Sequence, residues 1–173
     1  MSSIDNFTIR LVTQEDLPDL DRYLNQLSEE TRKRYGPHPF NLPTLQQLYL
    51  NQDDHRGYIV ISEGEIVAYT VVKLGYVDHD KQRLMSYGYE LDHSKDCTIA
   101  PSVADAWQSK GVGGKMFKYV LDDLAQLGFK RVILWGGVQA TNERAKRLYG
   151  THGFQLQGQF ENNGQNYDMV LEL

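Results

Sequence analysis

The feature that most constrains this chain is a glycine-rich turn placed directly before an amphipathic run. Residues 108–115 read Gln-Ser-Lys-Gly-Val-Gly-Gly-Lys, and the amphipathic run follows over residues 116–127. Three glycines at the start of a helix cost backbone entropy, so something has to come close to that backbone. The first N–H groups of a helix lack intrahelical partners and carry the positive end of the helix dipole. The turn therefore predicts an anion site, with a tight turn that binds no ligand as the alternative.

The apolar patterning of the chain predicts one α/β domain over residues 1–173, built on a mixed sheet. Alternating and apolar runs predict strands at residues 7–12, 58–62, 65–74, 97–104, 131–135, 154–160 and 165–173. Capping boxes and apolar periodicity predict helices at residues 13–27, 28–35, 44–51, 112–127 and 141–149. Glu63-Gly64 and Asn162-Asn-Gly164 have the composition of hairpin turns, and Gly128 suits the residue after a helix.

Two stretches are less regular. Residues 83–91 fit either a strand or a partly ordered loop. Pro101 lies inside the strand predicted at 97–104 and requires a bulge or an unpaired edge, because proline donates no hydrogen bond.

Composition excludes several classes of protein. Eighteen basic and twenty-three acidic residues give a net charge of −5, which argues against a nucleic-acid-binding surface and mildly favours a cationic or neutral substrate. The single cysteine, Cys97, excludes an internal disulfide framework and indicates a reducing compartment. The first residues lack an apolar signal region, and no run is long enough to span a membrane. We expect a cytoplasmic protein with neither membrane nor nucleic-acid partners.

The glycine turn does not fit two common nucleotide loops. A Walker A loop needs serine or threonine after Gly114-Lys115, but Met116 stands there. A dinucleotide fingerprint needs its third glycine later than Gly114. Instead, Gln108-x-x-Gly-x-Gly-Gly114, the preceding Val103-Ala-Asp-Ala-Trp107 and the later block Asn142-x-x-Ala-x-x-Leu-Tyr-x-x-x-Gly-Phe154 resemble the GNAT acyltransferase superfamily. The resemblance covers residues 97–173 well, and the earlier half only by the order of its elements.

The resemblance implies a fold and a co-substrate. It implies a mostly antiparallel sheet flanked by helices, with a V-shaped splay between the two central strands, and acetyl-CoA (coenzyme A) as co-substrate without a metal. The backbone residues implied to hold the pyrophosphate, with Gln108 ordering the turn, are Gln108, Lys110, Gly111, Val112, Gly113 and Gly114. The residues implied along the pantetheine arm and near the thiol are Ser102, Val103, Ala104, Asn142 and Tyr149.

The same resemblance implies an N-acetyltransferase, in which an amine attacks the thioester directly. Tyr149 is implied as the general acid for the leaving thiolate, unless it is a core aromatic residue. A backbone N–H near Val103 is implied to stabilise the oxyanion. Many members carry a glutamate where Thr98 stands here, so the general base is open. Among the nearby acids, Glu90, Asp92 and Asp96, we favour Glu90, because its aromatic neighbours would raise its pKa.

The acceptor and several alternatives stay open. The acceptor is a small-molecule amine or a protein or peptide amine, entering near residues 34–40 or 75–95. His38, between two prolines, is interpreted as a rigid turn residue. Cys97 has no recognisable histidine partner and is expected to be a buried thiol. The alternative functions are a non-catalytic acyl-CoA-binding regulatory module and a domain that binds another nucleotide. Members of the GNAT family are often homodimers, so the last hairpin is a candidate for pairing between two copies of the chain.

Overall fold

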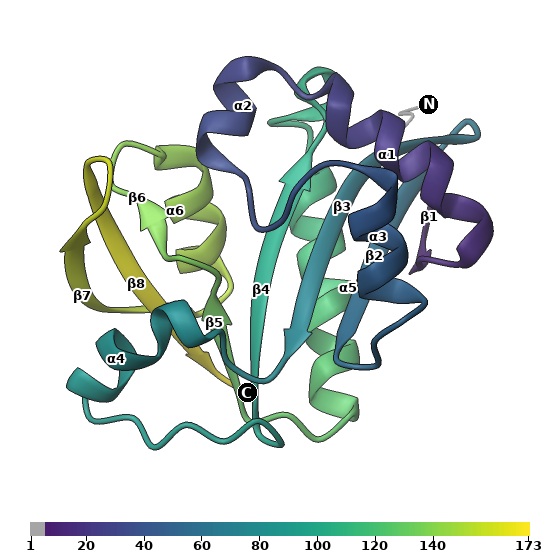
Figure 1. Ribbon diagram of the computed structural model, residues 1–173. Helices are drawn as coiled ribbons and strands as arrows, with labels where there is room; N and C mark the ends of the chain where they lie inside the picture. The colour runs from purple at the N-terminus through teal and green to yellow at the C-terminus, as the bar shows by residue number, and fades with distance from the viewer. Residues whose placement is uncertain (1–5) are drawn as a thin grey trace. The chain divides into compact units, whose positions relative to one another are not determined.

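A computed structural model of the chain describes residues 6–173, and Figure 1 shows its elements in chain order. The strands are β1 (Phe7–Leu11), β2 (His55–Ser62), β3 (Glu65–Leu74), β4 (Asp96–Val103), β5 (Arg131–Leu134), β6 (Val138–Gln139), β7 (Gln155–Glu161) and β8 (Gln165–Glu172). The helices are α1 (Leu17–Gln26), α2 (Glu29–Arg34), α3 (Leu42–Tyr49), α4 (Asp78–Ser86), α5 (Val112–Gln126) and α6 (Glu143–Thr151). Short 3₁₀ turns occupy Gln14–Asp16 and Asp105–Trp107.

The strands are hydrogen-bonded in the order β1-β2-β3-β4-β5-β8-β6, and β7 pairs with β8. β4 and β5 run parallel, whereas β1–β2, β5–β8, β6–β8 and β7–β8 are antiparallel. The predicted mixed, mostly antiparallel α/β fold is therefore confirmed. The β4–β5 register ends at Ile99 opposite Leu134, where β5 itself ends, and β4 continues for four more residues.

By its internal packing the chain forms two compact units. The first unit comprises residues 6–72 and Pro101–Val120, and the second comprises Lys73–Ala100 and Leu121–Leu173.

In the first unit, helices cover both faces of the strands. Tyr69 and Thr70 are neighbours on β3, so their side chains point to opposite faces. The Tyr69 hydroxyl contacts Tyr49 of α3, and the Thr70 hydroxyl donates to the sulfur of Met116 on α5 at 3.2 Å. The buried leucines Leu17, Leu20, Leu24 and Leu45 extend the α1 and α3 side of this core.

Side-chain caps explain where the N-terminal helices begin. Asp16 accepts hydrogen bonds from the backbone N–H and the hydroxyl of Thr13, as the predicted capping box requires, and α1 follows. The helix predicted at residues 44–51 from a capping box at Thr44-Leu-Gln-Gln47 has the wrong start. α3 begins at Leu42, because the side chain of Asn41 accepts from the N–H of Thr44. Asparagine is among the strongest N-cap residues, so it fixes the start two residues earlier than predicted.

In the second unit the least regular stretch is a helix. Residues 78–86 form α4, so the predicted strand or partly ordered loop over 83–91 is wrong for its first half. Leu84 is fully buried against Ile133 and Val170, and the carboxylate of Asp80 is buried as well. Arg83 explains that burial, since it donates to Asp80 at 2.6 Å and to Asp168 of β8 at 2.9 Å.

Two glycine turns match their predictions. Gly128 has φ +95°, and the N–H groups of Gly128 and Phe129 reach back to the last turn of α5. Asn163 and Gly164 both have positive φ at the β7–β8 turn, as a hairpin of this composition needs. The two-residue strand β6 was not predicted.

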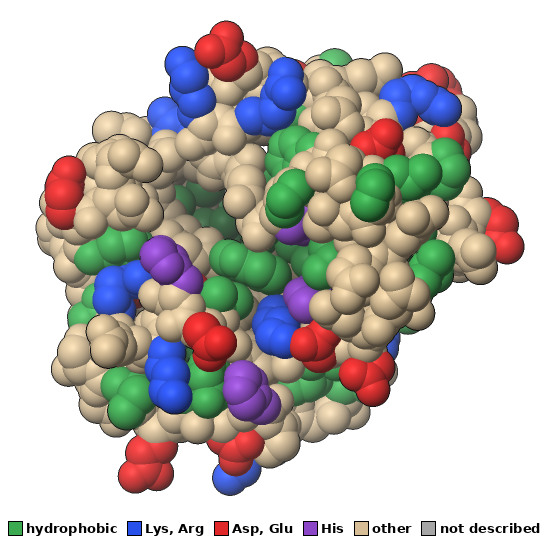
Figure 2. Space-filling model, in the orientation of Figure 1, with side chains coloured by type: hydrophobic (Ala, Val, Ile, Leu, Met, Phe, Trp, Pro, Cys, Tyr) green, Lys and Arg blue, Asp and Glu red, His purple; other side chains and the backbone are tan. Residues whose placement is uncertain are grey.

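Figure 2 shows acidic and basic side chains interspersed over the face in view. Within residues 6–173, no helix combines the length and the apolar composition needed to cross a bilayer.

Candidate functional site

The glycine turn of the first unit leads directly into α5. Ser109 and Gly111 have φ of +62° and +85°, and the N–H of Lys115 closes the first helical turn on the carbonyl of Gly111 at 3.2 Å. The N–H groups of Val112, Gly113 and Gly114 therefore precede the first closed turn, where a helix leaves its donors without intrahelical partners. Val112 is buried and anchors the turn, while Gly111 is exposed. This geometry suits an anion held by backbone donors.

Side chains hold the segment before the turn in place. The amide of Gln108 donates to the carbonyl of Val103 at 3.0 Å and to the hydroxyl of Thr31 at 3.3 Å. The carboxylate of Asp105 accepts from the N–H and the hydroxyl of Ser28 and from the hydroxyl of Thr31. The turn is thereby fastened to the start of α2, which reduces the entropy that a bound ligand would have to remove.

At the end of β4, one edge of the strand is hydrogen-bonded to β3. The N–H of Ala104 donates to the carbonyl of Val67 at 2.8 Å. Because successive N–H groups alternate between the two edges of a strand, the N–H of Val103 and the nitrogen of Pro101 belong to the other edge. The proline therefore removes no hydrogen bond to β3, which resolves the difficulty that its position raised in the sequence. That other edge is the one that the family resemblance gives to pantetheine.

Asn142 and Tyr149 lie on α6 in the second unit. The side-chain oxygen of Asn142 caps the helix by accepting from the N–H of Ala145 at 3.3 Å. Tyr149 is buried, with its ring centroid 5.6 Å from that of Phe154. Burial raises the pKa of the Tyr149 phenol above its usual value, so the hydroxyl keeps its proton throughout the neutral range. A protonated phenol is the form that a general acid needs.

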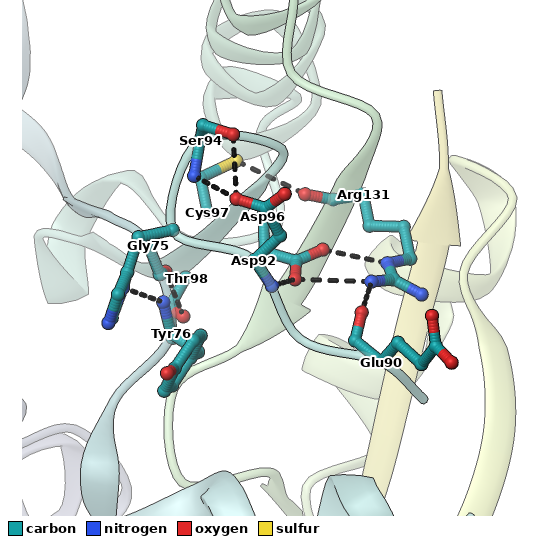
Figure 3. A network of polar contacts seen from close by, with 10 residues as sticks. Gly75, Tyr76, Glu90, Asp92, Ser94, Asp96, Cys97, Thr98 and Arg131 are labelled. Carbon is teal, nitrogen blue, oxygen red and sulfur yellow. Dashed lines mark hydrogen bonds and ion pairs between the residues drawn. The ribbon is translucent and has the colours of Figure 1, made fainter. Parts of the chain in front are cut away.

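The acids near Thr98 have different surroundings from those expected, as Figure 3 shows. Asp96 is fully buried in β4 and accepts from the guanidinium of Arg131 at 2.7 Å, so it is not a solvated loop carboxylate. Glu90 is exposed, and its backbone carbonyl, not its carboxylate, accepts from Arg131 at 2.5 Å. The apolar setting expected around the Glu90 carboxyl group is therefore wrong. The hydroxyl of Thr98 donates to the carbonyl of Gly75 at 2.9 Å.

Cys97 is buried, and its thiol donates to the carbonyl of Arg131 at 3.4 Å. Burial, together with the neighbouring Asp96, raises the pKa of the thiol to about 12. A thiol in that state is a poor nucleophile at neutral pH, which argues against an acetyl-cysteine intermediate.

The Asp96–Arg131 ion pair is expected to contribute to the stability of the fold. Asp96→Ala would leave the guanidinium of Arg131, which is 18% exposed, without its carboxylate, and the N–H of Asp92 without its acceptor. We expect a loss of about 3 kcal/mol in the free energy of unfolding, as for other broken buried pairs. Urea unfolding would measure it, with Asp53→Ala as the control at an exposed aspartate. An equal, small effect of both substitutions would contradict this assignment.

The structure also brings together a group that the sequence did not indicate. His38, Tyr49 and Tyr69 of the first unit form a chain of hydrogen bonds, and His38 is therefore more than a rigid turn residue. The three residues come from a loop, a helix and a strand, so no local pattern marks them.

Comparisons with known proteins agree with the fold. The model of the Acetyltransferase (GNAT) family matches residues 20–154. A spermine/spermidine N(1)-acetyltransferase of Bacillus subtilis (strain 168) is 37% identical over 71 residues, which cover 41% of this chain and 45% of that protein. A probable spermine N(1)-acetyltransferase of Bacillus subtilis subsp. natto (strain BEST195) is 39% identical over 67 residues, which cover 39% and 43%. The chain thus spans less than half the length of the curated relatives it matches.

Solved structures with similar folds cover nearly the whole chain. The GNAT domain of S. lividans PAT has a TM-score of 0.75 at 18% identity, covering 95% of this chain and 89% of that one. The structure of AAC(6')-Ib in complex with paromomycin and acetyl-CoA has a TM-score of 0.70 at 25% identity, covering 97% and 94%. With the family model spanning most of the residues, including the glycine turn and α6, this chain belongs to the acetyltransferase (GNAT) family.

Proposed function

We propose that this protein is an N-acetyltransferase that moves the acetyl group of acetyl-CoA to an amine by direct attack on the thioester. The observation that carries the proposal is the turn at Gly111–Gly114, whose backbone donors open α5. Glycine at these positions lets phosphate oxygens approach the N–H groups without a Cβ in the way. Lys110 adds positive charge beside the turn. Its ammonium lies 5.6 Å from the ring centroid of Trp107.

The chemistry assigns a role to few residues. A neutral amine attacks the thioester carbonyl carbon, and the free backbone edge of β4 at Val103 supplies an N–H for the oxyanion. The carbon–sulfur bond then breaks, and the sulfur leaves with the electron pair of that bond. Tyr149 gives its proton to the sulfur, the attacking nitrogen releases its second proton to solvent as the amide forms, and Tyr149 regains a proton from solvent. An ammonium group has no lone pair, so a base must first remove its proton.

We propose a polyamine as the acceptor class. The spermine/spermidine acetyltransferase of Bacillus subtilis is among the curated relatives, and a protein of net charge −5 favours a cation over an anion. Aminoglycosides are polycationic amines as well, and they form the second class to test.

Turnover is the test of this function. The protein is incubated with acetyl-CoA and, in separate reactions, spermidine, paromomycin, a lysine peptide or buffer alone. Release of the coenzyme A thiol and the mass of the product are both followed. Acetylated spermidine above the buffer control supports the proposal. If acetyl-CoA binds but no amine is acetylated, the chain is the non-catalytic acyl-CoA-binding module instead.

The compartment is also part of the proposal. A single cysteine, buried and unpaired, suits the reducing cytoplasm, where acetyl-CoA is available.

A further inference from the structure

Three polar side chains of the first unit form a continuous chain of hydrogen bonds between the sheet and the loop that joins α2 to α3. The ring nitrogen Nε2 of His38 lies 3.0 Å from the hydroxyl of Tyr69 on β3. That hydroxyl in turn shares a short hydrogen bond with the hydroxyl of Tyr49 on α3. The other ring nitrogen of His38, Nδ1, lies 2.8 Å from the backbone carbonyl of Pro39.

The direction of every hydrogen bond follows from the Pro39 carbonyl. A carbonyl oxygen only accepts, so Nδ1 of His38 must carry a proton. In the neutral imidazole the second nitrogen, Nε2, is then an acceptor, and Tyr69 must donate to it. Since the single proton of Tyr69 is used, Tyr49 must donate to Tyr69. The neutral chain therefore runs Tyr49 to Tyr69 to His38, and its open end is the hydroxyl oxygen of Tyr49.

The surroundings keep His38 neutral. Its ring contacts the ring of Phe40 and that of Tyr69, with centroids 5.9 and 6.0 Å away, and His55 is a titratable neighbour on β2. Burial lowers the pKa of His38, the hydrogen bond to the Pro39 carbonyl opposes this, and electrostatic interaction with His55 lowers the pKa further. At a given pH near the pKa, His38 is therefore protonated in a smaller fraction of folded molecules than of unfolded chains. The stability contributed by neutral His38 is fully present above about pH 6.5 and is lost as the pH falls through the lower folded pKa.

The chain lies next to the strand that the proposed function assigns to acetyl-CoA. The hydroxyl of Ser102 on β4 lies 3.3 Å from the backbone carbonyl of Tyr69, and it also pairs with Tyr23 of α1 at 3.0 Å. Meanwhile Thr98, at the usual place of a glutamate, uses its hydroxyl to hold Gly75. A base is needed, and the first unit provides a half-buried, directed proton acceptor beside the pantetheine strand.

We propose that Tyr49, Tyr69 and His38 form a proton relay that deprotonates the acceptor amine in place of a carboxylate on β4. This inference rests on the proposed N-acetyltransferase function. The ammonium proton passes, directly or through water, to the oxygen of Tyr49. Tyr49 passes its own proton to Tyr69, and Tyr69 passes its proton to Nε2 of His38. The freed lone pair attacks the thioester, and His38 later releases its proton to solvent.

The relay ends in a state whose hydrogen bonds are all satisfied, with the His38–Tyr69 and Tyr69–Tyr49 bonds reversed and the bond to Pro39 unchanged. Protonated His38 donates from both nitrogens, to Pro39 and to Tyr69, and Tyr69 then donates to Tyr49. Both tyrosines remain neutral, so the net effect is that one positive charge moves from the ammonium group to His38. Gly57 on β2 leaves the room that Tyr49 occupies, because a Cβ there would lie 2.8 Å from the hydroxyl and from the ring of Tyr49.

The first test of the relay needs no activity. In protein labelled with ¹⁵N-histidine, the nitrogen spectrum of His38 near pH 8 should show the tautomer with the proton on Nδ1. Tyr69→Phe removes the donor to Nε2, and the His38 resonances should shift in that variant. A His38 with its proton on Nε2, or one unaffected by Tyr69→Phe, overturns the relay whatever the enzyme does.

The second test uses turnover of spermidine by acetyl-CoA. In His38→Gln and Tyr69→Phe we expect kcat at pH 7 to fall about a hundredfold, the size of a general-base contribution. The acidic limb of the kcat–pH profile should disappear in His38→Gln. Stabilisation of both variants by acetyl-CoA should match the wild type, which shows that they fold and bind. His152→Gln and Tyr119→Phe are matched controls, because neither residue takes part in the hydrogen bonds of the relay.

A change of acceptor separates a chemical role from a structural one. An amine with a pKa below the assay pH is already neutral, so His38→Gln should acetylate it at nearly the wild-type rate. If His38→Gln keeps the wild-type pH profile while Glu90→Gln loses activity, Glu90 is the base and the relay is overturned. If the wild-type protein binds acetyl-CoA but transfers no acetyl group, the proposed function itself fails, and the relay fails with it.

Discussion

Gly114→Val is expected to abolish the stabilisation of this protein by acetyl-CoA while leaving its fold intact. Gly114 lies in the first turn of α5 with a helical backbone, and no heavy atom lies within 4 Å of a Cβ added there. The fold therefore accepts a side chain at this position. A branched side chain would instead occupy the space through which a pyrophosphate reaches the backbone donors.

The expected size of this effect follows from linkage. Acetyl-CoA at a hundredfold excess over its Kd should stabilise the wild-type protein by about 2.7 kcal/mol, and Gly114→Val should lose nearly all of that gain. Gly150→Val is the matched control, because Gly150 is also a helical glycine with open space around its Cβ, on α6. If Gly114→Val binds acetyl-CoA as tightly as Gly150→Val does, the turn does not hold the pyrophosphate.

Tyr149→Phe is expected to lower kcat about a hundredfold, with little change in the KM for acetyl-CoA. The substitution keeps the ring, which is buried against Phe154, and removes only the hydroxyl. A general acid contributes about a hundredfold or more to a proton transfer in the transition state, whereas its contribution to substrate binding is small.

The raised pKa of Tyr149 adds a second readout. Because burial raises that pKa above the usual value, the phenol stays protonated up to alkaline pH, and no basic limb below about pH 10 should come from Tyr149. Steady-state kinetics over pH 6–9.5 would check both points, with Tyr119→Phe as the control at an exposed tyrosine. An unchanged kcat in Tyr149→Phe would make Tyr149 a core aromatic residue only.

The sequence predicts the parts of the fold that local rules determine. The hairpin turns at Glu63-Gly64 and Asn163-Gly164, the C-terminal Gly128 and the start of α5 each follow from residues within one turn. The family resemblance rests on the same kind of signal, since the glycine turn and the block on α6 are both short and contiguous.

Helix α4 was missed because its sequence carries little helical signal. It begins after Val77, which makes no side-chain cap, and its residues are mostly polar. Its position depends on Leu84 packing among Ile133 and Val170, and on Arg83 binding Asp168 of β8. Those contacts join residues between 49 and 86 positions apart, so no local pattern could predict them.

In the candidate site, too, the sequence predicts the parts that depend on local residues and misses the parts that depend on the fold. Backbone donors at the turn could be predicted, because glycine spacing is local. The surroundings of Glu90 could not, since aromatic neighbours in the sequence leave its carboxyl group exposed in the fold. The His38–Tyr69–Tyr49 chain could not be predicted either, because the loop, strand and helix that carry it meet only in the folded unit.

The most direct test of the central claim is thermal unfolding of the wild-type protein with and without acetyl-CoA, with ATP and NAD at the same concentration as controls. We predict a rise in Tm of about 5 to 10 °C with acetyl-CoA at a hundredfold excess over its Kd, and no comparable rise with ATP or NAD. An unchanged Tm with acetyl-CoA, or an equal rise with ATP, would contradict the account of the glycine turn as an acetyl-CoA site.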